Sequence, residues 1–341
     1  MITSRTPFRV SFFGGGTDYP VWFRRNPGAV LSTSIDKYCY ITCRYLPPFF
    51  EYSSRIVYSK IELVKTPDEI QHPVVREALK YLGIRDGVEI RHGADLPART
   101  GLGSSSTFAV GLIHALHAMQ NRMSSKNQLS TEAIHIEQNI LRENVGCQDQ
   151  VISAHGGLNR IDFHSDDSFT VSPVILPPAR VREFNDHLLL FFTGFTRLAS
   201  DIAGEQIENT GRKENELMRM YDMVGKGIDM LVSGAVESFG EMLHEAWTLK
   251  RTLSSKVSTP AIDEVYNEAR AAGAIGGKLL GAGGGGFMLL FARPADHAAI
   301  RQRLSKFLCV PFSFETSGSQ IIVYQPDAMG DILQHSNIQN A

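Results

Sequence analysis

Residues 97–107 join a glycine- and serine-rich loop, Pro-Ala-Arg-Thr-Gly-Leu-Gly-Ser-Ser-Ser-Thr, directly to the start of an expected helix. From Ser104 to Met119, apolar residues recur every three to four positions, a spacing that predicts an amphipathic helix. Small residues let backbone N–H groups face outward, the helix start adds partial positive charge, and the hydroxyls can bond oxygens or a metal ion. An isolated run of this kind is more often a linker with a serine cap, but a linker rarely ends in register with a helix. We therefore expect this loop to bind a polyphosphate.

The chain has 341 residues, 43% hydrophobic and 21% charged, and this composition excludes disordered, collagen-like and coiled-coil proteins. The chain is longer than most domains with a single hydrophobic core, so we expect two packed domains with a cleft between them. Strand-like runs dominate the first ninety residues, two helices follow, and a buried strand is expected from His187 to Thr193. Further helices are expected at about 211–256, 260–272 and 294–307. Two strands are expected around a glycine cluster, and a last strand is expected at 321–324. This order predicts an α+β fold with a boundary near residue 180.

The charge balance limits the class of partner. Lys and Arg number 34 against 36 Asp and Glu, a net charge of -2, which argues against a nucleic-acid or anionic membrane surface. The four cysteines lack the spacing of a zinc site or a disulfide framework, so we expect reduced thiols in the cytoplasm. The sequence also has no signal-peptide core and no run of about 18 apolar residues, so neither export nor a membrane span is expected.

A second glycine cluster, residues 276–286, contains the pattern G-x-G-x-x-G at Gly281, Gly283 and Gly286. An apolar strand follows it, where a dinucleotide-binding unit needs a helix, and Leu279 stands where a Walker loop needs Ser or Thr. A tight hairpin and a loop that approaches a ligand closely remain equally open.

A third cluster, Gly14 to Asp18, follows an expected strand that carries Arg9. Its glycines allow close approach of the backbone to a ligand, and Asp18 could accept hydrogen bonds from sugar hydroxyls. An Asx-turn is the alternative role for Asp18 and is favoured if the residue is considered alone.

Two further acidic residues are candidates for a functional role. Glu137 lies three residues after Ile134 and four before Leu141, so helical geometry places its carboxylate on an inward-facing apolar stripe. A buried acid of this kind forms an ion pair with an Arg or, near a phosphate loop, binds Mg²⁺. Asp149 lies between two glutamines ahead of a small-residue turn, and by itself it would be a helix cap.

Together these segments resemble the GHMP kinase superfamily, named for galactokinase, homoserine kinase, mevalonate kinase and phosphomevalonate kinase. The family's three motifs occur in order at residues 6–18, 97–107 and 279–287, so the resemblance covers nearly the whole chain. Residues 11–18, Ser-Phe-Phe-Gly-Gly-Gly-Thr-Asp, are most similar to the branch of D-glycero-D-manno-heptose 7-phosphate kinases. The resemblance implies a domain like ribosomal protein S5 domain 2 over residues 1–180 and a ferredoxin-like domain over residues 181–335.

The resemblance also implies roles for residues at the motif positions. Asp149 would be the catalytic acid beside the acceptor hydroxyl, with Arg9 close to it, and Ser105 and Glu137 would hold Mg²⁺. ATP contacts are implied for Gly101, Leu102, Gly103, Ser104, Ser105, Ser106, Gly283 and Gly284. Sugar contacts are implied for Gly15, Gly16, Thr17, Asp18 and, from a further segment of this branch, Arg197.

The implied reaction is ATP-dependent phosphorylation of the C1 hydroxyl of D-glycero-D-manno-heptose 7-phosphate, which in the family feeds nucleotide-heptose and surface polysaccharide synthesis. Gly15 and Gly16 replace the Glu-His pair of galactokinases, which removes two sugar contacts and opens space for a bulkier phosphosugar. A kinase of another sugar such as fucose, or a non-catalytic sensor of ATP and sugar, are the alternatives. Intact Arg9, Glu137 and Asp149 argue against the sensor. No nucleic-acid or membrane partner is expected, and a homodimer is left open.

Overall fold

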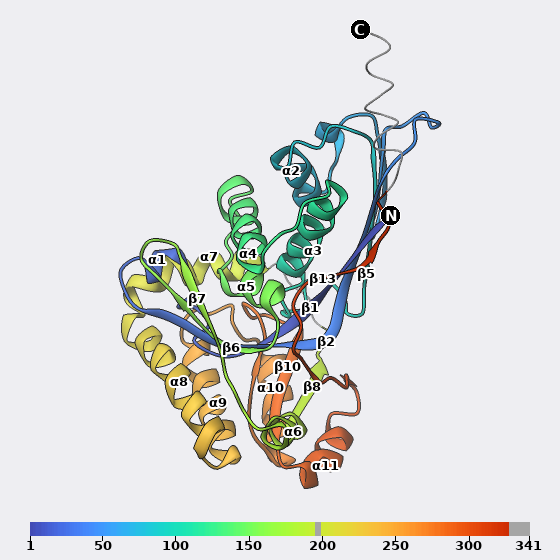
Figure 1. The fold of residues 1–341 in the computed structure, drawn as a ribbon. Helices are drawn as coiled ribbons and strands as arrows, with labels where there is room; N and C mark the ends of the chain where they lie inside the picture. The colour runs from blue at the N-terminus through green and yellow to red at the C-terminus, as the bar shows by residue number, and fades with distance from the viewer. Residues whose placement is uncertain (195–198, 327–341) are drawn as a thin grey trace.

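The computed structural model describes residues 1–194 and 199–326 and contains two sheets flanked by helices (Figure 1). In the larger sheet, strands follow the order β13-β1-β2-β5-β3-β4, and β6 and β12 also pair with β2 while β7 pairs with β6. β2 is long enough to pair with β1 over most of its length, with β5 at one end and with β6 at the other. The strands of this sheet are β1 (Ile2–Phe13), β2 (Gly28–Tyr45), β3 (Ser54–Val57), β4 (Ile61–Val64), β5 (Val88–Ala94), β6 (Leu158–Phe163), β7 (Phe169–Pro173), β12 (Phe314–Glu315) and β13 (Gln320–Tyr324).

Helices of the first half pack mainly on one face of this sheet (Figure 1). α3 contacts β1 and β2 and is covered by α4 and α5, so it is buried on nearly every side and is apolar nearly all round. This burial fixes the position of its N-terminus, where the glycine- and serine-rich loop ends. The helices are α1 (Pro20–Phe23), α2 (Pro73–Tyr81), α3 (Ser104–Met119), α4 (Lys126–Ile134), a π-helical segment (His135–Ile140) and α5 (Gln148–His155).

The smaller sheet is antiparallel, with the order β11-β8-β10-β9. All residues of β10 are buried, which explains its uninterrupted apolar sequence. α9 packs on β9 and β10, and α8 packs on α9 and reaches β1 and β2 of the larger sheet. The elements are β8 (Leu188–Phe192), β9 (Ala274–Leu279), β10 (Phe287–Ala292), β11 (Leu308–Cys309), α6 (Pro178–Asp186), α7 (Ala199–Asn209), α8 (Glu214–Ser233), α9 (Val236–Arg251), α10 (Pro260–Ala271) and α11 (His297–Arg303).

The main element predictions are confirmed, with two differences. The helical stretch expected at 211–256 is two helices, because the backbone at Gly234 is extended and interrupts the helical hydrogen bonds. The helix expected at 294–307 is shorter and begins at His297. The last strand, β13, pairs with β1 of the larger sheet, with Tyr324 opposite Ile2. The domain boundary at residue 180 stays a prediction. The last described strand, β13, belongs to the sheet that the first half of the chain forms.

One hydrophobic cluster extends through both sheets. The Phe184 ring packs against Phe12 at 5.2 Å, Phe239 at 4.7 Å and Phe314 at 5.5 Å between centroids. Side chains from β1, α6, α9 and β12 therefore share one core. All four cysteines are free. Among the helices of residues 1–194 and 199–326, none has the length and apolar character needed to span a bilayer.

Candidate active site

A buried arginine joins an acid to the loop that starts α3. Arg9 donates from Nε and Nη2 to the two carboxylate oxygens of Asp149, each at 2.7 Å, and from Nη1 to the carbonyl of Gly101 at 2.6 Å. The Arg9 side chain is 4% exposed, whereas Asp149 is 23% exposed, so a ligand can reach the acid. Bidentate pairs of this kind fix both direction and distance. The carboxylate is thereby held rigidly beside the loop.

The loop itself has the conformation that the glycines allow. Gly101 and Gly103 have φ angles of 83° and 77°, in the left-handed region that favours glycine. Gly103 is the residue before the first turn of α3, and a Cβ there would lie 3.1 Å from Oδ2 of Asp149. Backbone and acid are thus in close contact at the N-terminus of a 16-residue helix. The partial positive charge of this end favours an anion.

The loop between β9 and β10 packs directly on the first loop. A Cβ at Gly101 would overlap the carbonyl of Leu280, and one at Gly286 would overlap that of Thr100. The N–H of Phe287 donates to the Thr100 carbonyl at 3.0 Å. The two glycine clusters therefore form one surface, and the second is more than an isolated hairpin. We call residues 97–104 the phosphate loop and residues 280–286 the third glycine loop.

Asp18 is the second acid of the site and is 2% exposed. Its carboxylate accepts hydrogen bonds from the N–H groups of Gly16 at 3.0 Å and of Gln148, at the start of α5, at 3.3 Å. Burial raises the pKa of Asp18, the two N–H groups oppose this, and the charge of Asp149 adds to the increase. An Asx-turn would need the N–H two residues after Asp18, but that residue is Pro20, which has no N–H, so the Asx-turn interpretation is wrong.

Glu137 is fully buried in the π-helical segment beneath α3. It accepts hydrogen bonds from the hydroxyls of Ser105 and Ser106, each at 2.8 Å, and from the side-chain amide of Gln150 at 2.6 Å. Burial raises its pKa to about 7, and the three hydrogen bonds only partly offset this. Within the described ranges no Lys or Arg pairs with it, so the interpretation as an ion pair with an arginine is wrong. Among residues 1–194 and 199–326, nothing therefore supplies a countercharge to this carboxylate next to the phosphate loop.

Comparison with known proteins identifies the family of the chain. The model of the GHMP kinases N-terminal domain matches residues 70–157, and that of the GHMP kinases C-terminal domain matches residues 228–308. The chain belongs to the GHMP kinases. Enzymes of this family use ATP, so the chain is an ATP-dependent kinase.

Individual relatives cover most of this GHMP kinase. D-glycero-alpha-D-manno-heptose 7-phosphate kinase of Campylobacter jejuni is 28% identical over 89% of the chain and 93% of its own length. The bifunctional fucokinase/GDP-fucose pyrophosphorylase of Arabidopsis thaliana is 28% identical over 88% of the chain, which spans only 31% of that longer protein. A crystal structure described as a D-glycero-D-manno-heptose 1-phosphate kinase from Bacteroides thetaiotaomicron has a TM-score of 0.72 and 23% identity, covering 95% and 100% of the two chains. This likeness confirms the two-domain GHMP kinase fold.

Most of the residues expected in the site of this GHMP kinase do converge. Arg9 and Asp149 form the pair expected of them, and Gly101, Gly103 and Ser104 line the start of α3. Leu102 contributes backbone only, since its side chain is fully buried and its carbonyl accepts the N–H of Arg9. A ligand role for these residues stays a prediction.

Two expected contacts, that of Thr17 and that of Gly283 and Gly284, look different in space, and a third cannot be placed. The hydroxyl of Thr17 is buried and bonded to the backbone of Gly14 and Ala29, so it stabilises the turn. In the third glycine loop, Gly281 and Gly286 touch the phosphate loop, whereas Gly283 and Gly284 pack on the carbonyl of Val257. Arg197 lies outside the described residues.

Two buried lysines were missed. Lys250 of α9 and Lys278 of β9 are 7% and 4% exposed and lie near the charges of Arg9 and Asp18. A signal existed for Lys250, because it follows Leu243, Ala246 and Trp247 at helical spacing and so lies on the apolar stripe of α9. Lys278 lies in the second glycine cluster, whose glycine pattern carries no signal for a buried lysine.

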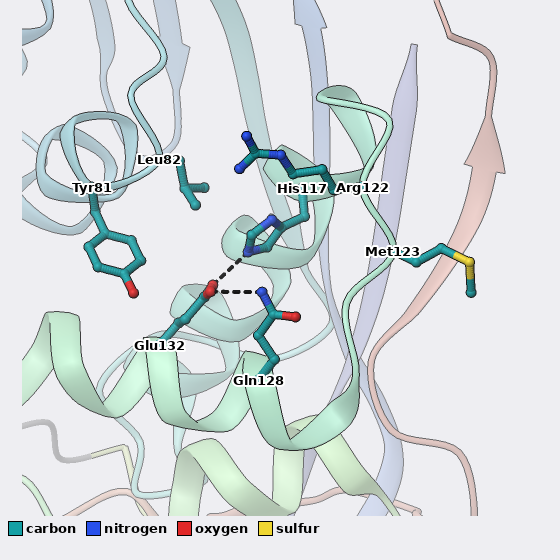
Figure 2. A pocket seen from close by; sticks show the side chains of 7 residues that line it. All are labelled: Tyr81, Leu82, His117, Arg122, Met123, Gln128 and Glu132. Carbon is teal, nitrogen blue, oxygen red and sulfur yellow. Dashed lines mark hydrogen bonds and ion pairs between the residues drawn. The ribbon is translucent and has the colours of Figure 1, made fainter.

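Two surface pockets of this kinase are lined by other residues. One, of about 640 Å³, is at the C-terminal end of α3 and contains the His117 and Glu132 pair, whose side chains are 2.6 Å apart (Figure 2). A second, of about 700 Å³, is lined by residues that follow α1 and by parts of β6. The site described above is therefore defined by its charged groups and glycine loops.

Proposed function

We propose that this GHMP kinase transfers the γ-phosphoryl group of ATP to the C1 hydroxyl of D-glycero-D-manno-heptose 7-phosphate. The observation that carries the proposal is the Arg9 side chain, which bonds Asp149 and the phosphate loop at the same time. This contact holds an accessible acid next to the helix N-terminus that suits the ATP phosphates. The sugar is proposed from the heptose 7-phosphate kinase relative and from the spelling of residues 11–18.

Phosphoryl transfer depends mainly on positioning and on stabilising charge on the phosphoryl oxygens. Backbone N–H groups of Gly103 to Ser105 at the start of α3 would bind those oxygens. Asp149 would orient the attacking hydroxyl and accept its proton as the new O–P bond forms. Both of its oxygens already accept from Arg9, but each carboxylate oxygen has a further lone pair. Asp18, held by α5, would accept hydrogen bonds from other sugar hydroxyls.

A magnesium ion fits the donor set near Glu137. The described residues contain no group of three or more His, Cys, Asp or Glu that could hold a metal by themselves. Mg²⁺, however, is usually bound through one or two carboxylates together with substrate phosphates. Glu137, with a buried and uncompensated carboxylate, and Ser105, with a hydroxyl 2.8 Å from it, would hold the ion. When bound, Mg²⁺ neutralises charge on the phosphates.

The catalytic pair argues against a role as a sensor. A protein that only binds ATP and sugar has no need to bury Arg9 and pair it with a partly exposed acid. Fucose remains the second candidate sugar, because fucokinases are among the relatives.

The experiment is ADP formation from ATP with a panel of sugars. The panel contains D-glycero-D-manno-heptose 7-phosphate, the unphosphorylated heptose, L-fucose, D-galactose and D-mannose 6-phosphate. We expect the highest kcat/KM with the heptose 7-phosphate, and phosphorus NMR should show a phosphate coupled to the anomeric proton. If L-fucose gives the highest kcat/KM, the proposed substrate is wrong and fucose takes its place. ATP binding without ADP formation from any sugar would contradict the kinase reaction.

A further inference from the structure

The two buried lysines have no place in the mechanism above. Lysine is almost never fully buried unless its ammonium is paired. Lys250 donates to the carbonyl of Leu279 at 3.2 Å and to that of Gly281, and Lys278 donates to the carbonyl of Phe12 at 2.8 Å. These partners are backbone groups beside two different motifs: the third glycine loop for Lys250 and the start of the segment with Asp18 for Lys278.

Lys250 acts at the point where the two glycine loops meet. Gly281 has a φ angle of 73°, and a Cβ on it would overlap Gly101. Gly101 in turn accepts the Nη1 hydrogen bond of Arg9. The contact between the loops is therefore held by a cation on each side, Arg9 on the phosphate loop and Lys250 on the third glycine loop.

The ammonium of Lys250 also belongs to the charge cluster of the site. Burial and the charge of Arg9 lower its pKa to about 7, while Asp18 and Asp149 act in the opposite direction. Lys278 lies near the same groups, and burial together with the charges of Lys250 and Arg9 lowers its pKa well below the usual value.

We infer that Lys250 is a positioning residue for the nucleotide: its ammonium holds the third glycine loop against the phosphate loop, so that the surface for the ATP phosphates is formed before ATP binds. This inference rests on the proposed function only in taking ATP as the nucleotide. The inference does not depend on which sugar accepts the phosphoryl group. Lys278 has a separate effect, because it holds the end of β1 that leads to Asp18.

The test is the affinity of the full chain for AMPPNP with Mg²⁺, measured by calorimetry without sugar. Lys250→Met removes the donors at nearly constant volume, and we expect the Kd to rise roughly 10- to 100-fold, as for loss of hydrogen bonds from a charged group. Lys278→Met is the matched control, since it is an equally buried lysine with a backbone partner elsewhere. Its Kd should stay within about threefold of the original protein. Lys250→Arg keeps a cation and should retain much of the affinity.

Three results would overturn the inference. The first is an unchanged Kd in folded Lys250→Met. The second is an equal rise in Lys278→Met, which would indicate a general effect of lost stability. The third is a Lys250→Arg protein as weak as Lys250→Met. If Lys250→Met does not fold, Lys250→Gln takes its place in the comparison. Because no sugar is present, these results are independent of the substrate panel.

Discussion

Arg9 and Asp149 show how far one pair of side chains organises the site. The guanidinium is almost fully buried, and its three hydrogen bonds connect β1, α5 and the phosphate loop. Removing one member of such a pair leaves a buried charge without a partner, which is destabilising. A substitution that tests the acid must therefore keep an acceptor for Arg9.

Asp149→Asn meets this requirement and should separate binding from chemistry. We expect AMPPNP affinity to stay within about threefold, because the phosphate loop is unchanged. We expect kcat to fall roughly 10²- to 10⁴-fold, the usual contribution of a general base. A coupled ADP assay with the best sugar of the panel measures the change. Turnover within tenfold of the original enzyme would contradict the role of Asp149.

Glu137 provides a pH-dependent prediction. Its pKa is raised from 4.5 to about 7, so the folded protein binds this proton more tightly than the unfolded chain does. The contribution of this proton to the free energy of unfolding is complete below pH 4.5. It is lost as the pH rises through about 7. Without metal, Glu137→Gln should therefore raise the melting temperature at pH 8 by roughly 2–6 °C relative to the original protein.

The control for Glu137→Gln is the same comparison at pH 4.5, where both side chains are neutral and the difference should be small. Melting curves in EDTA at the two pH values give the answer. An equal effect of the substitution at both pH values would show that the carboxylate does not titrate as described. With ATP present, the same substitution should raise the Mg²⁺ concentration needed for half-maximal activity.

The loops of the site depend on close contact between glycines of different elements. Gly101 precedes α3, and Leu280 and Gly281 follow β9, yet their backbones touch. Sequence patterns located both glycine clusters but gave no reason for them to meet. That contact follows from the packing of the β9 and β10 hairpin against the start of α3, which joins residues about 180 positions apart along the chain.

Gly101→Ala should disrupt this contact. The new Cβ would overlap the Leu280 carbonyl and would also occupy a left-handed backbone, so we expect the KM for ATP to rise at least tenfold. Gly83→Ala is the matched control, because Gly83 has a similar φ angle of 68° but no atom within 4 Å of the added Cβ. Steady-state kinetics at varied ATP should show little change in this control. A similar KM in both variants would mean that the contact between the loops is unimportant.

The two sheets are connected by a shared core and by the returning strand β13. Phe184 lies at the centre of the shared core, among rings from both sheets and from α9. This arrangement predicts that the two halves unfold together. The site lies between them, so its geometry depends on the whole fold.

Phe184→Ala should lower the free energy of unfolding by about 3–5 kcal/mol, as for other large buried aromatic residues. Calorimetry should show a single transition with a lower midpoint. Phe50→Ala, at a 48% exposed phenylalanine, is the control and should change stability by less than about 0.5 kcal/mol. Two separate transitions in the original protein would contradict a common core.

Local patterns along the chain were sufficient to locate the glycine loop before α3, α3 itself, the inward-facing Glu137 and the buried strands, because glycine backbone freedom and apolar spacing act over a few neighbouring residues. They also allowed the family to be named from three motifs in order. The partners of Glu137, the contact between the two glycine loops, the placement of Lys250 and Lys278, and the pairing of β13 with β1 required the tertiary structure. These features depend on which distant segments pack together and provide hydrogen-bond partners for buried charges and backbone groups. Sequence patterns over a few residues do not contain this information.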